Sequence, residues 1–314
     1  MSKKLYLGID MGGTSIKIAV VDAKGLITEE TSIKTDLNQS PAKLANDIAR
    51  QAALLKNYPK IKSIGIGIAG DIDCEKGVVR FSPNLPKWRN VKLKQIIEKL
   101  TKKNVFVDND ANTAAIGAFW LDAGGKSDNL ICITLGTGVG GGLIFGKKLY
   151  RGKTCTAGEI GHITIDSQGH KCNCGNRGCA ETYIGANYVA RYSVDYLKTH
   201  KSKIIDDMTG KDYSKITPKV LYDAALKGDK TSVEIWKYVG EKLGVLLADI
   251  VNFINPDTII LCGGVSLAGK FLIDPAQKEM KERSFQTAYK ACKLQVSHYT
   301  SKLGVVGAAM LAEQ

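Results

Sequence analysis

Hydrophobic residues recur along the chain with two different periods, and their alternation predicts a mixed α/β protein. The runs at 4–9 and 16–21 are rich in β-forming residues and are separated by the glycine turn DMGGTS, which predicts two strands joined as a hairpin. Apolar residues then recur at helical spacing over 41–57, and a continuous apolar run predicts a buried strand at 63–70. Strands and helices therefore alternate from the start of the chain.

The same patterns predict the remaining elements. An amphipathic helix is expected over 91–101, a short strand over 104–107 and a further helix over 111–120. Four more helices are expected at 184–198, 218–227, 230–252 and 304–313, with a strand at 257–262.

A second hairpin pattern lies at 130–149, where the runs LICITL and GGLIFG flank GTGVG. Because it repeats the layout of the first hairpin, the sequence predicts an internal duplication, with two similar α/β domains facing each other across a cleft. We place the small domain at 1–117 plus 299–314 and the large domain, which includes the cysteine-rich loop, at 118–298.

Composition narrows the class of protein. With 314 residues, 44% of them hydrophobic, the chain can bury the cores of about two domains. The start of the chain lacks the apolar run of a signal peptide, and no stretch approaches the roughly 20 apolar residues of a membrane span, so we expect a cytoplasmic protein. In that setting clustered cysteines are interpreted as metal ligands and scattered ones as buried thiols.

The formal net charge of +13 raises the question of a nucleic-acid partner. The lysines are spread over polar segments such as 56–62, 87–103 and 198–219, without an arginine-rich block or a basic stripe interleaved with aromatic residues. This distribution favours a solvated basic surface over a nucleic-acid site. It also leaves open a polyanionic phosphate donor.

The first glycine turn, Asp10 to Thr14, places backbone N–H groups, a hydroxyl and a carboxylate at the mouth of a hairpin. Glycine lets phosphate oxygens approach the amides, and Asp10 is suited to hold Mg²⁺ through water. An ordinary tight turn explains the same residues, so this motif alone does not decide between the two interpretations.

The second turn, at 136–142, contains a formal G-x-G-x-x-G after a strand, which raises the alternative of a dinucleotide-binding fold. That fingerprint requires a helix next, whereas the LIF run that follows continues as a strand. The G-x-x-x-x-G-K match over 141–147 lacks its required Ser or Thr, because Lys148 follows. We therefore interpret the turn as a second phosphate-binding hairpin, and two such hairpins predict a nucleoside triphosphate held between the domains.

The segment DNDAN, residues 108–112, lies where a predicted strand ends and a helix begins. A carboxylate there can accept the proton of a substrate hydroxyl, and Asn109 can hydrogen-bond the neighbouring hydroxyls of a polyol. Helix capping explains one of these residues but not four polar residues in five. Asp110 is the candidate base, even if it also helps to cap the helix.

The densest chemical cluster is GEIGH at 158–162, followed by CNC at 172–174 and by Cys179. Three cysteines within eight residues, with a histidine nearby, meet the needs of a tetrahedral Cys₃His zinc site of the closed, structural kind. Spacing leaves the fourth ligand open between His162 and His170. The remaining cysteines are expected to be small packing residues: Cys74, Cys132, Cys155, Cys262 and Cys292.

Several motifs, taken in order, span nearly the whole chain and resemble the ROK family of sugar kinases and sugar-responsive repressors: DMGGTSIK, GIAGDID, SPNLPKW, DNDAN, LGTGVGGG, GEIGH and CNCGNRGCAE. The resemblance implies the two-domain actin-like ATPase (ribonuclease H-like) fold with a nucleotide and sugar cleft between the domains. It places the adenine near Gly263 and Gly264 and the phosphates between the two glycine turns.

The resemblance also implies roles for individual residues. In the family pattern the histidine of GEIGH is both a zinc ligand and a sugar contact, so His162 takes precedence over His170, and Asp110 deprotonates the attacking hydroxyl. The implied zinc ligands are His162, Cys172, Cys174 and Cys179. The implied sugar-binding residues are Gly70, Asn84, Asn109, Asp110, Glu159, His162 and Glu181. The implied nucleotide-binding and Mg²⁺-binding residues are Asp10, Gly12, Gly13, Thr14, Lys17, Gly136, Thr137, Gly138, Gly263 and Gly264. A solvated surface residue is the alternative for each glutamate.

We therefore expect an ATP-dependent hexose kinase with Mg²⁺ and Zn²⁺, most similar to glucokinases, and the family implies a homodimer. Kinases for fructose, allose, N-acetylglucosamine and N-acetylmannosamine share most of the motifs, and the TYIG run after Glu181 departs from the small-residue pattern of many glucokinases. A sugar-sensing repressor is the alternative from another class. Such repressors carry a helix-turn-helix domain first, and the phosphate turn at residue 10 leaves no room for one.

Overall fold

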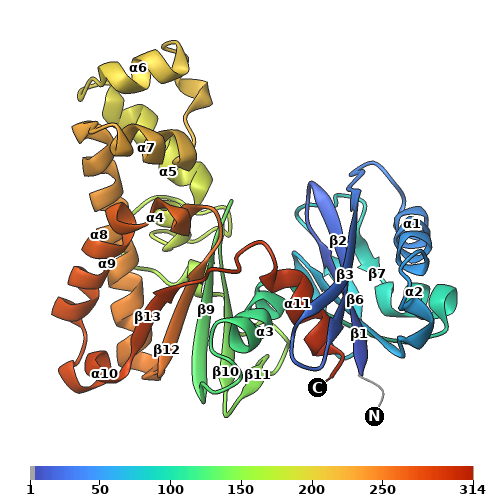
Figure 1. Ribbon diagram of the computed structural model, residues 1–314. Helices are drawn as coiled ribbons and strands as arrows, with labels where there is room; N and C mark the ends of the chain where they lie inside the picture. Colours follow the sequence, from blue (N-terminus) through green and yellow to red (C-terminus); the bar gives the residue numbers. More distant parts are fainter. Residues whose placement is uncertain (1–3, 314) are drawn as a thin grey trace. The chain divides into compact units, whose positions relative to one another are not determined.

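A computed structural model describes residues 4–313 of the chain, which fold into two compact units (Figure 1). The first unit takes in the chain up to Cys132, then Gly142–Gly158 and the segment from Ser297 onward. The second unit comprises Ile133–Gly141 and Glu159–Val296. The C-terminal segment therefore belongs to the first unit.

A mixed five-stranded sheet forms the centre of the first unit, in the order β3-β2-β1-β4-β8. Its strands are β1 (Leu5–Met11), β2 (Ser15–Asp22), β3 (Ile27–Lys34), β4 (Ser63–Ile68) and β8 (Asn104–Asn109). β1 and β2 run antiparallel with Leu5 opposite Asp22 and Met11 opposite Ile16, which confirms the predicted hairpin. β4 lies parallel to both β1 and β8, so all three of these strands end at the same edge of the sheet.

Helices cover both faces of this sheet (Figure 1). On one face, α1 (Pro41–Ala53) and α2 (Leu93–Thr101) bury their apolar stripes against alternate strand residues such as Leu7 and Ile9. On the other face lie α3 (Asp110–Leu121) and α11 (Leu303–Leu311).

Glycines explain how closely α11 approaches the sheet. A Cβ atom on Gly8 would lie 2.0 Å from the carbonyl oxygen of Val305, and one on Gly65 would lie 1.7 Å from that of Ala308. Neither distance is compatible with a side chain, so glycine at both positions lets the helix backbone rest directly on the strands. Leu5, Leu7, Ile9 and Met11 of β1 then face α1 and α2.

A small antiparallel sheet of the first unit follows β4, in the order β5-β6-β7. Its strands are β5 (Asp71–Asp73), β6 (Val78–Phe81) and β7 (Arg89–Val91). Each has only three or four residues, too few for a period to be recognised in the sequence. Arg80 of β6 forms ion pairs with Asp71 and Asp73 of β5.

A second five-stranded sheet has the order β11-β10-β9-β12-β13. Its strands are β9 (Asn129–Leu135), β10 (Val139–Phe145), β11 (Lys148–Tyr150), β12 (Thr258–Cys262) and β13 (Lys293–Val296). β10 pairs with β11 in antiparallel fashion, and β12 pairs with β13 in parallel. The expected strands at 130–149 and 257–262 are therefore present.

The helices of the second unit include every one predicted there. They are α4 (Glu181–Ile184), α5 (Ala186–Leu197), α6 (Lys203–Thr209), α7 (Pro218–Leu226), α8 (Lys230–Ile254), α9 (Lys270–Arg283) and α10 (Gln286–Ala291). Short 3₁₀ turns occur in both units at Tyr58–Lys60, Ile160–His162, Tyr213–Lys215 and Val265–Ala268. Within the described part of the chain, no helix combines the length and apolar character that crossing a membrane requires.

Helices α8 and α9 pack along each other, again through glycines. A Cβ atom on Gly240 or Gly244 of α8 would lie 2.5 Å from the carbonyl oxygen of Leu272 or Ala276, respectively, in α9. The sequence analysis did not predict α9, because Pro275 lies inside it. The tertiary contact with α8 outweighs that local signal.

Candidate active site and metal centre

The first phosphate-binding turn joins β1 to β2 in the first unit. Its backbone is fixed by a hydrogen bond from the Gly12 N–H to the Ser15 carbonyl at 3.1 Å and by one from the Thr35 hydroxyl to the Gly12 carbonyl at 2.8 Å. Asn84 lies next to this turn, since a Cβ atom on Gly13 would lie 3.5 Å from its side-chain carbon. The predicted nucleotide residues of this unit and one predicted sugar residue are therefore neighbours.

Asp10 is the next-to-last residue of β1 and lies beside the first turn of α11. A Cβ atom on Gly304 would lie 2.7 Å from an Asp10 carboxylate oxygen, so the carboxylate rests against the helix backbone. Burial raises the pKa of Asp10 above its usual range, and Lys17 on β2 offsets part of that rise. Lys17 itself donates to the Ser301 carbonyl at 2.7 Å. A carboxylate in this setting gains most from a cation such as Mg²⁺.

The β8–α3 junction carries the DNDAN segment. Asn109 is the cap of α3, and its Oδ1 accepts from the Ala111 N–H at 2.8 Å. Its Nδ2 donates to the Gly70 carbonyl at 3.0 Å, so two of the predicted sugar residues touch. Asp110 begins the helix, where the positive end of the helix dipole favours a charged carboxylate.

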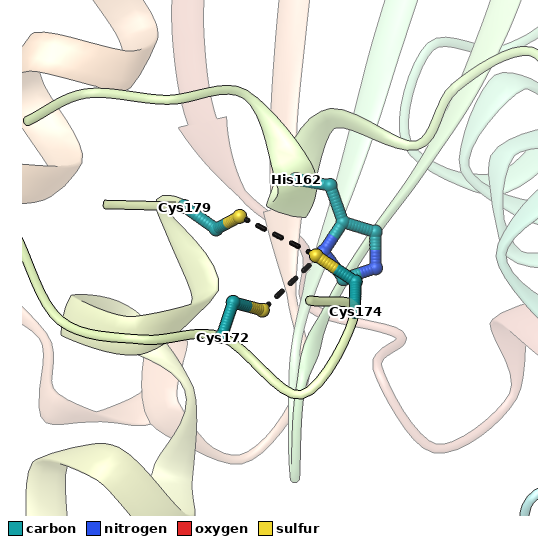
Figure 2. A group of neighbouring side chains, drawn as sticks. All are labelled: His162, Cys172, Cys174 and Cys179. Carbon is teal, nitrogen blue, oxygen red and sulfur yellow. Dashed lines mark hydrogen bonds between the residues drawn. The ribbon is translucent and has the colours of Figure 1, made fainter. Parts of the chain in front are cut away.

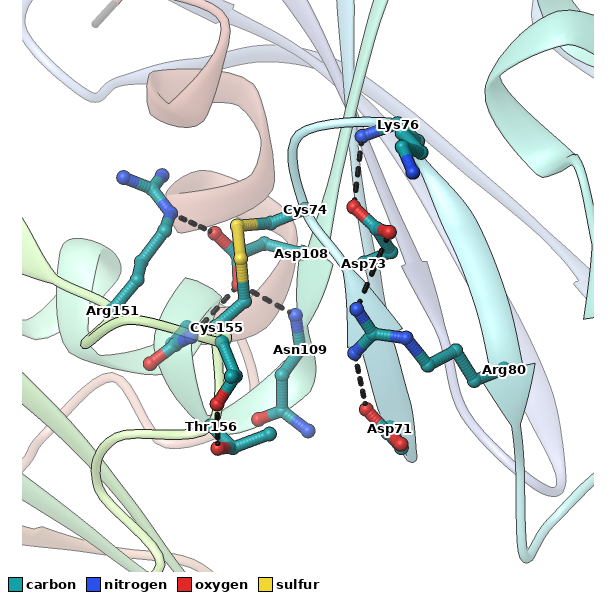
Figure 3. The surroundings of a disulfide bond; sticks show 12 residues. Asp71, Asp73, Cys74, Lys76, Arg80, Asp108, Asn109, Arg151, Cys155 and Thr156 are labelled. Atoms are coloured by element: carbon teal, nitrogen blue, oxygen red, sulfur yellow. Dashed lines mark hydrogen bonds and ion pairs between the residues drawn. A yellow bond between two sulfur atoms is a disulfide. The ribbon is translucent and has the colours of Figure 1, made fainter.

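Asp108 fastens this junction, although sequence reasoning gave it no role. Its carboxylate is 1% exposed; Oδ1 accepts from the Asn109 N–H and the Asn112 Nδ2, both at 2.8 Å. Oδ2 accepts from the Arg151 Nε at 2.7 Å (Figure 3). The ion pair and these hydrogen bonds fix the backbone on both sides of Asp110. Arg151 gave no signal, because it lies 43 residues away in the sequence.

Gly70 follows β4 with a φ of +134°, which favours glycine. A Cβ atom there would lie 2.1 Å from the Phe81 carbonyl oxygen of β6. Its backbone thus runs close to β6 while its carbonyl meets Asn109. Glycine at this position is therefore a structural requirement of the junction.

The second phosphate-binding turn and Glu181 touch within the second unit. The Gly136 N–H donates to the Gly138 carbonyl at 3.0 Å, which closes the turn. The Glu181 Oε2 accepts from the Val139 N–H at 3.0 Å, and a Cβ atom on Gly138 would lie 2.3 Å from the same oxygen. Glu181, predicted only as a sugar ligand, therefore also shapes this turn.

Gly263 and Gly264, the glycines predicted to lie near the adenine, directly follow β12. Gly263 has a φ of +95°, and a Cβ atom there would lie 2.4 Å from the Leu135 carbonyl oxygen of β9. Gly264 has open space where its side chain would be. Gly264 thus leaves its backbone uncovered, which is what the approach of a flat ring requires, whereas Gly263 lets the chain pack directly against β9.

Four side chains of the second unit gather as predicted: His162, Cys172, Cys174 and Cys179 (Figure 2). Their ligand atoms all lie within 4.8 Å of one another. The Cys172 sulfur is 3.8 Å from the His162 Nδ1, and the Cys174 and Cys179 sulfurs are 3.7 Å apart. A tetrahedral zinc with bonds of about 2.3 Å to sulfur separates its ligand atoms by about 3.8 Å. The donor set and its spacing therefore fit zinc.

His162 is the histidine of this cluster, and His170 instead lies beside the Tyr183 ring, with ring centroids 5.2 Å apart. The Nε2 of His162, on the far side of its ring from the sulfurs, lies 4.0 Å from a Glu159 carboxylate oxygen. Gly161 lets this short turn rest on β10, because a Cβ atom there would lie 2.1 Å from the Val139 carbonyl oxygen. Two predicted sugar-binding groups are thus adjacent.

The cysteines of the cluster differ in their protonation behaviour. Burial raises the pKa of Cys172, and burial together with its sulfur neighbours raises that of Cys179 to about 12. The Asn176 N–H lowers the pKa of the exposed Cys174. Gathering such thiols as thiolates requires a cation, which zinc supplies.

The cysteine-rich loop is braced against α8. The Tyr183 hydroxyl donates to the Asp166 Oδ2 at 3.0 Å, and the Lys242 Nζ lies 4.8 Å from the centre of the Tyr183 ring. Gly178 has a φ of +67° and lies directly against the Asp166 carbonyl. Sequence reasoning missed this brace; the signal for it was an aromatic residue two positions after Glu181.

Two cysteines predicted to be separate packing thiols are joined in a disulfide, which corrects that expectation. Cys74 follows β5 and Cys155 follows β11, 81 residues apart in the sequence and 6.1 Å apart between Cα atoms (Figure 3). Pairing at this distance in the sequence depends on tertiary structure and leaves no local pattern. The other three predicted packing cysteines, Cys132, Cys262 and Cys292, are not in disulfides, and the first two are buried.

The fold and these residues define a two-domain α/β protein of the actin-like ATPase class. The chain belongs to the ROK family, whose model matches residues 6–314. It is 32% identical to a glucokinase of Thermotoga maritima over all of this chain and 99% of that protein.

Two further comparisons bear on activity. A ROK family glucokinase from Streptomyces griseus, solved in complex with glucose and AMPPNP, matches with a TM-score of 0.83, 33% identity and 99% coverage of both chains. A xylose repressor of Caldicellulosiruptor bescii is 32% identical over 96% of this chain and 76% of that protein.

Proposed function

We propose that this protein transfers the γ-phosphoryl group of ATP to a hexose, with glucose as the first candidate and glucose 6-phosphate as product. The observation that carries the proposal is the β8–α3 junction, where Asp110 opens a helix whose cap, Asn109, is bonded to the Gly70 carbonyl. The similarity to glucokinases, one of them solved with glucose and an ATP analogue, supports the choice of substrate and donor.

In the proposed reaction Asp110 accepts the proton of the attacking sugar hydroxyl. Asn109, Asn84 and the backbone near Gly70 bind sugar hydroxyls, and so do Glu159, His162 and Glu181. General base catalysis of this kind contributes about 10²- to 10⁴-fold in rate. Exclusion of water from the bound substrates limits wasteful hydrolysis of ATP.

The phosphate groups are assigned to the two glycine turns. Asp10, Gly12, Gly13, Thr14 and Lys17 form one set, and Gly136, Thr137 and Gly138 form the other, with Gly263 and Gly264 beside the adenine. Asp10 would hold Mg²⁺, which would supply positive charge to neutralise the transferred phosphoryl group. His162, Cys172, Cys174 and Cys179 would hold zinc, which would order the loop that carries the sugar ligands. We place the protein in the cytoplasm, where ATP is available as phosphoryl donor. The family resemblance supports a homodimer.

The test is ADP release from Mg·ATP with a panel of hexoses: glucose, fructose, allose, N-acetylglucosamine and N-acetylmannosamine. We expect turnover with glucose, and a loss of about 10²- to 10⁴-fold in kcat in Asp110→Asn with sugar binding retained. Asp128→Asn, which changes an exposed carboxylate 3.5 Å from the Lys147 Nζ, is the matched control.

The outcomes separate the parts of the proposal. Near wild-type turnover in Asp110→Asn contradicts the base assignment. Turnover with another hexose alone replaces glucose as the substrate. Sugar binding without turnover from ATP or polyphosphate points to a sensor of the kind that the similarity to a xylose repressor raises.

A further inference from the structure

The disulfide lies in a segment that has no role in the mechanism above. We call residues 151–158 the strap: it follows β11 and ends at Gly158, the last residue of the first unit before Glu159. Cys155 of the strap is bonded to Cys74, in the turn between β5 and β6 (Figure 3). The strap therefore leads from Arg151, which forms an ion pair with Asp108 of the β8–α3 junction, to the proposed sugar ligands Glu159 and His162.

Side-chain bonds rather than apolar packing hold the strap to its unit. At its start, Arg151 forms the ion pair with the buried Asp108. In its middle the disulfide fixes Cys155, while Lys153, Thr154 and Thr156 around it are exposed.

The strap backbone is unfavourable for an untethered chain. Gly152, Cys155 and Gly158 have φ values of +68°, +65° and +92°. The left-handed conformation of Cys155, a residue with a Cβ atom, has to be maintained by what surrounds it. The bond to Cys74 contributes, together with the hydrogen bond from the Ala157 N–H to the Arg151 carbonyl at 3.1 Å and the one between the Thr154 and Thr156 hydroxyls at 2.7 Å.

The chemistry of the surroundings suits thiol exchange. Both cysteines are half-buried, so a small dithiol can reach a sulfur, and the nearby side chains are polar, among them Asp71, Arg80 and Thr156 (Figure 3). In a cytoplasm kept reducing by thiols, disulfides that do form are mostly transient and redox-sensing. A bridge in this place is therefore suited to opening and closing.

We propose that the Cys74–Cys155 disulfide is a redox-controlled tether that sets the affinity of the enzyme for its sugar. This inference rests on the proposed function, because its consequence passes through Glu159 and His162, the proposed sugar ligands that follow the strap. With the bridge closed, the strap is ordered before the sugar arrives. With the bridge open, the strap has to become ordered when the sugar binds, and the lost conformational entropy lowers the affinity for the sugar.

Opening takes two exchange steps. A thiolate of a dithiol reductant attacks one sulfur of the bridge, so the protein S–S bond breaks, a mixed disulfide forms and one cysteine leaves as a thiolate. The second thiol of the reductant then attacks the mixed disulfide and releases the other cysteine. The protein gains two electrons and two protons, and the reductant becomes a cyclic disulfide. A small disulfide such as oxidised glutathione reverses the change and leaves as two thiols.

The effect should fall on affinity rather than on the chemical step. Asp110 is held by its position in α3 and by the bonds of Asp108 and Asn109, which do not involve the disulfide. The strap contributes to them at its first residue, where Arg151 pairs with the buried Asp108 carboxylate, and this ion pair stays in place when the bridge four residues further along opens. We therefore expect reduction to raise the sugar KM by about tenfold, while kcat changes by no more than about twofold.

The first experiment uses the zinc-loaded protein, poised with oxidised glutathione or with dithiothreitol, and measures ADP release against glucose concentration. The double variant Cys74→Ser/Cys155→Ser should show the high KM of the reduced wild type in both conditions. Cys292→Ser, which removes a half-buried free cysteine elsewhere, should respond as the wild type does. Zinc content is measured in every sample, because the cluster thiolates also react with oxidants. A double variant that keeps the low KM, or that still responds to dithiothreitol with its zinc intact, overturns the proposal.

The second experiment does not depend on kinase activity. Trypsin can cleave the strap after the exposed Lys153, and peptide mapping follows that site, since Arg151 is held in its ion pair with Asp108. Cleavage there should accelerate by about tenfold on reduction of the wild type and be equally fast in the double variant under both conditions. Unchanged cleavage means that the bridge does not tether the strap, and faster cleavage with an unchanged sugar KM means that the tether does not act on the sugar; either result overturns the proposal.

If no hexose is phosphorylated, the proposed function fails separately. Calorimetric titration of glucose then replaces the KM measurement. Reduction should weaken glucose binding by about tenfold in the wild type and not in the double variant; equal affinities in the two redox states overturn the tether.

Discussion

The β8–α3 junction and the loop from His162 to Cys179 supply most of the polar groups of the proposed reaction, and they are held together in opposite ways. At the junction, the buried Asp108 carboxylate is satisfied by two N–H donors and by Arg151. In the loop, four ligand groups converge within 4.8 Å, with the pKa of two thiols raised. The Asp108 carboxylate of the junction is fully satisfied by hydrogen-bond donors of the chain itself. The four groups of the loop instead require a metal ion to hold them together.

The two regions should therefore lose their geometry for different reasons. Groups fixed by hydrogen bonds and a buried ion pair lose their geometry when one partner is removed, because the other is left without compensation. Groups fixed by a metal lose it together when the metal leaves, because the binding free energy of the ion is part of the folding free energy. Variants of the metal ligands and of the Asp108 ion pair distinguish these two causes.

Removing the metal should have the largest effect. Cys174→Ser deletes an exposed ligand without leaving a cavity, so its consequences report the ion rather than lost packing. We expect zinc to fall from about one per chain to near zero, sugar phosphorylation to be nearly abolished and the melting temperature to drop by more than about 5 °C. Metal analysis, activity and thermal melts measure these changes, with Cys292→Ser as control. A folded, active protein without metal would falsify the Cys₃His assignment.

Breaking the junction should cost less and leave the metal in place. Arg151→Met leaves Asp108, 1% exposed, without its counter-charge, while Arg151 itself is 28% exposed. We expect unfolding free energy to fall by about 2 kcal/mol, below the cost for a pair with both partners buried, and kcat to fall by about tenfold. Denaturant unfolding, kinetics and zinc analysis measure the three quantities.

A second change tests the reason for that loss. Asp108→Asn combined with Arg151→Met replaces the stranded carboxylate with an amide, so it should regain much of the stability that Arg151→Met loses. Arg151→Lys should lie between the wild type and Arg151→Met, since it restores the charge but not the guanidinium geometry. If the double variant is less stable than Arg151→Met, the loss has another origin than an uncompensated charge.

Local chemistry explains what could be predicted from the sequence. The first hairpin, the helix begun by Ser40 and Pro41, and the strand-to-helix step at DNDAN were predicted because their periods and caps lie within a few residues of one another. The three cysteines of the metal centre also occur within eight residues, so a metal site there was predictable from residue types and spacing, whereas the choice of His162 over His170 rested on the family resemblance.

What could not be predicted depends on partners far apart in the chain. Arg151 and Asp108, and Cys74 and Cys155, meet only once the sheet has formed, and neither pair leaves a local pattern. Helix α9 was missed because Pro275 lies inside it, although the glycines of α8 provide its packing surface. The roles assigned to the individual sugar and nucleotide residues stay predictions.

Asp10 provides a third case, because it is a half-buried carboxylate of the first unit whose pKa is raised by burial. A raised pKa means that the folded state holds its proton longer than the unfolded state, so stability is lost as pH rises from the ordinary aspartate pKa through the folded value. Asp10→Asn should therefore raise the melting temperature of the ligand-free protein at pH 7 by about 2–4 °C, while removing activity with Mg·ATP. The gain should shrink as pH falls toward 4. Thermal melts across this range test the sign, and a lower melting temperature at pH 7 contradicts it.

The brace between the cysteine-rich loop and α8 should show the smallest effect. Tyr183→Phe removes the hydroxyl that donates to Asp166 while keeping the ring under Lys242. That hydrogen bond lowers the pKa of Asp166, so its contribution is present above the ordinary aspartate pKa and disappears as pH falls through the lower folded value. We expect the melting temperature to fall by about 1–2 °C at pH 7 and zinc to exchange faster. Tyr213→Phe, which removes an equivalent hydroxyl from Asp206 at 2.6 Å, should lower stability without changing zinc exchange. Equal zinc exchange in both variants would show that the metal alone holds the loop and that the brace adds only general stability.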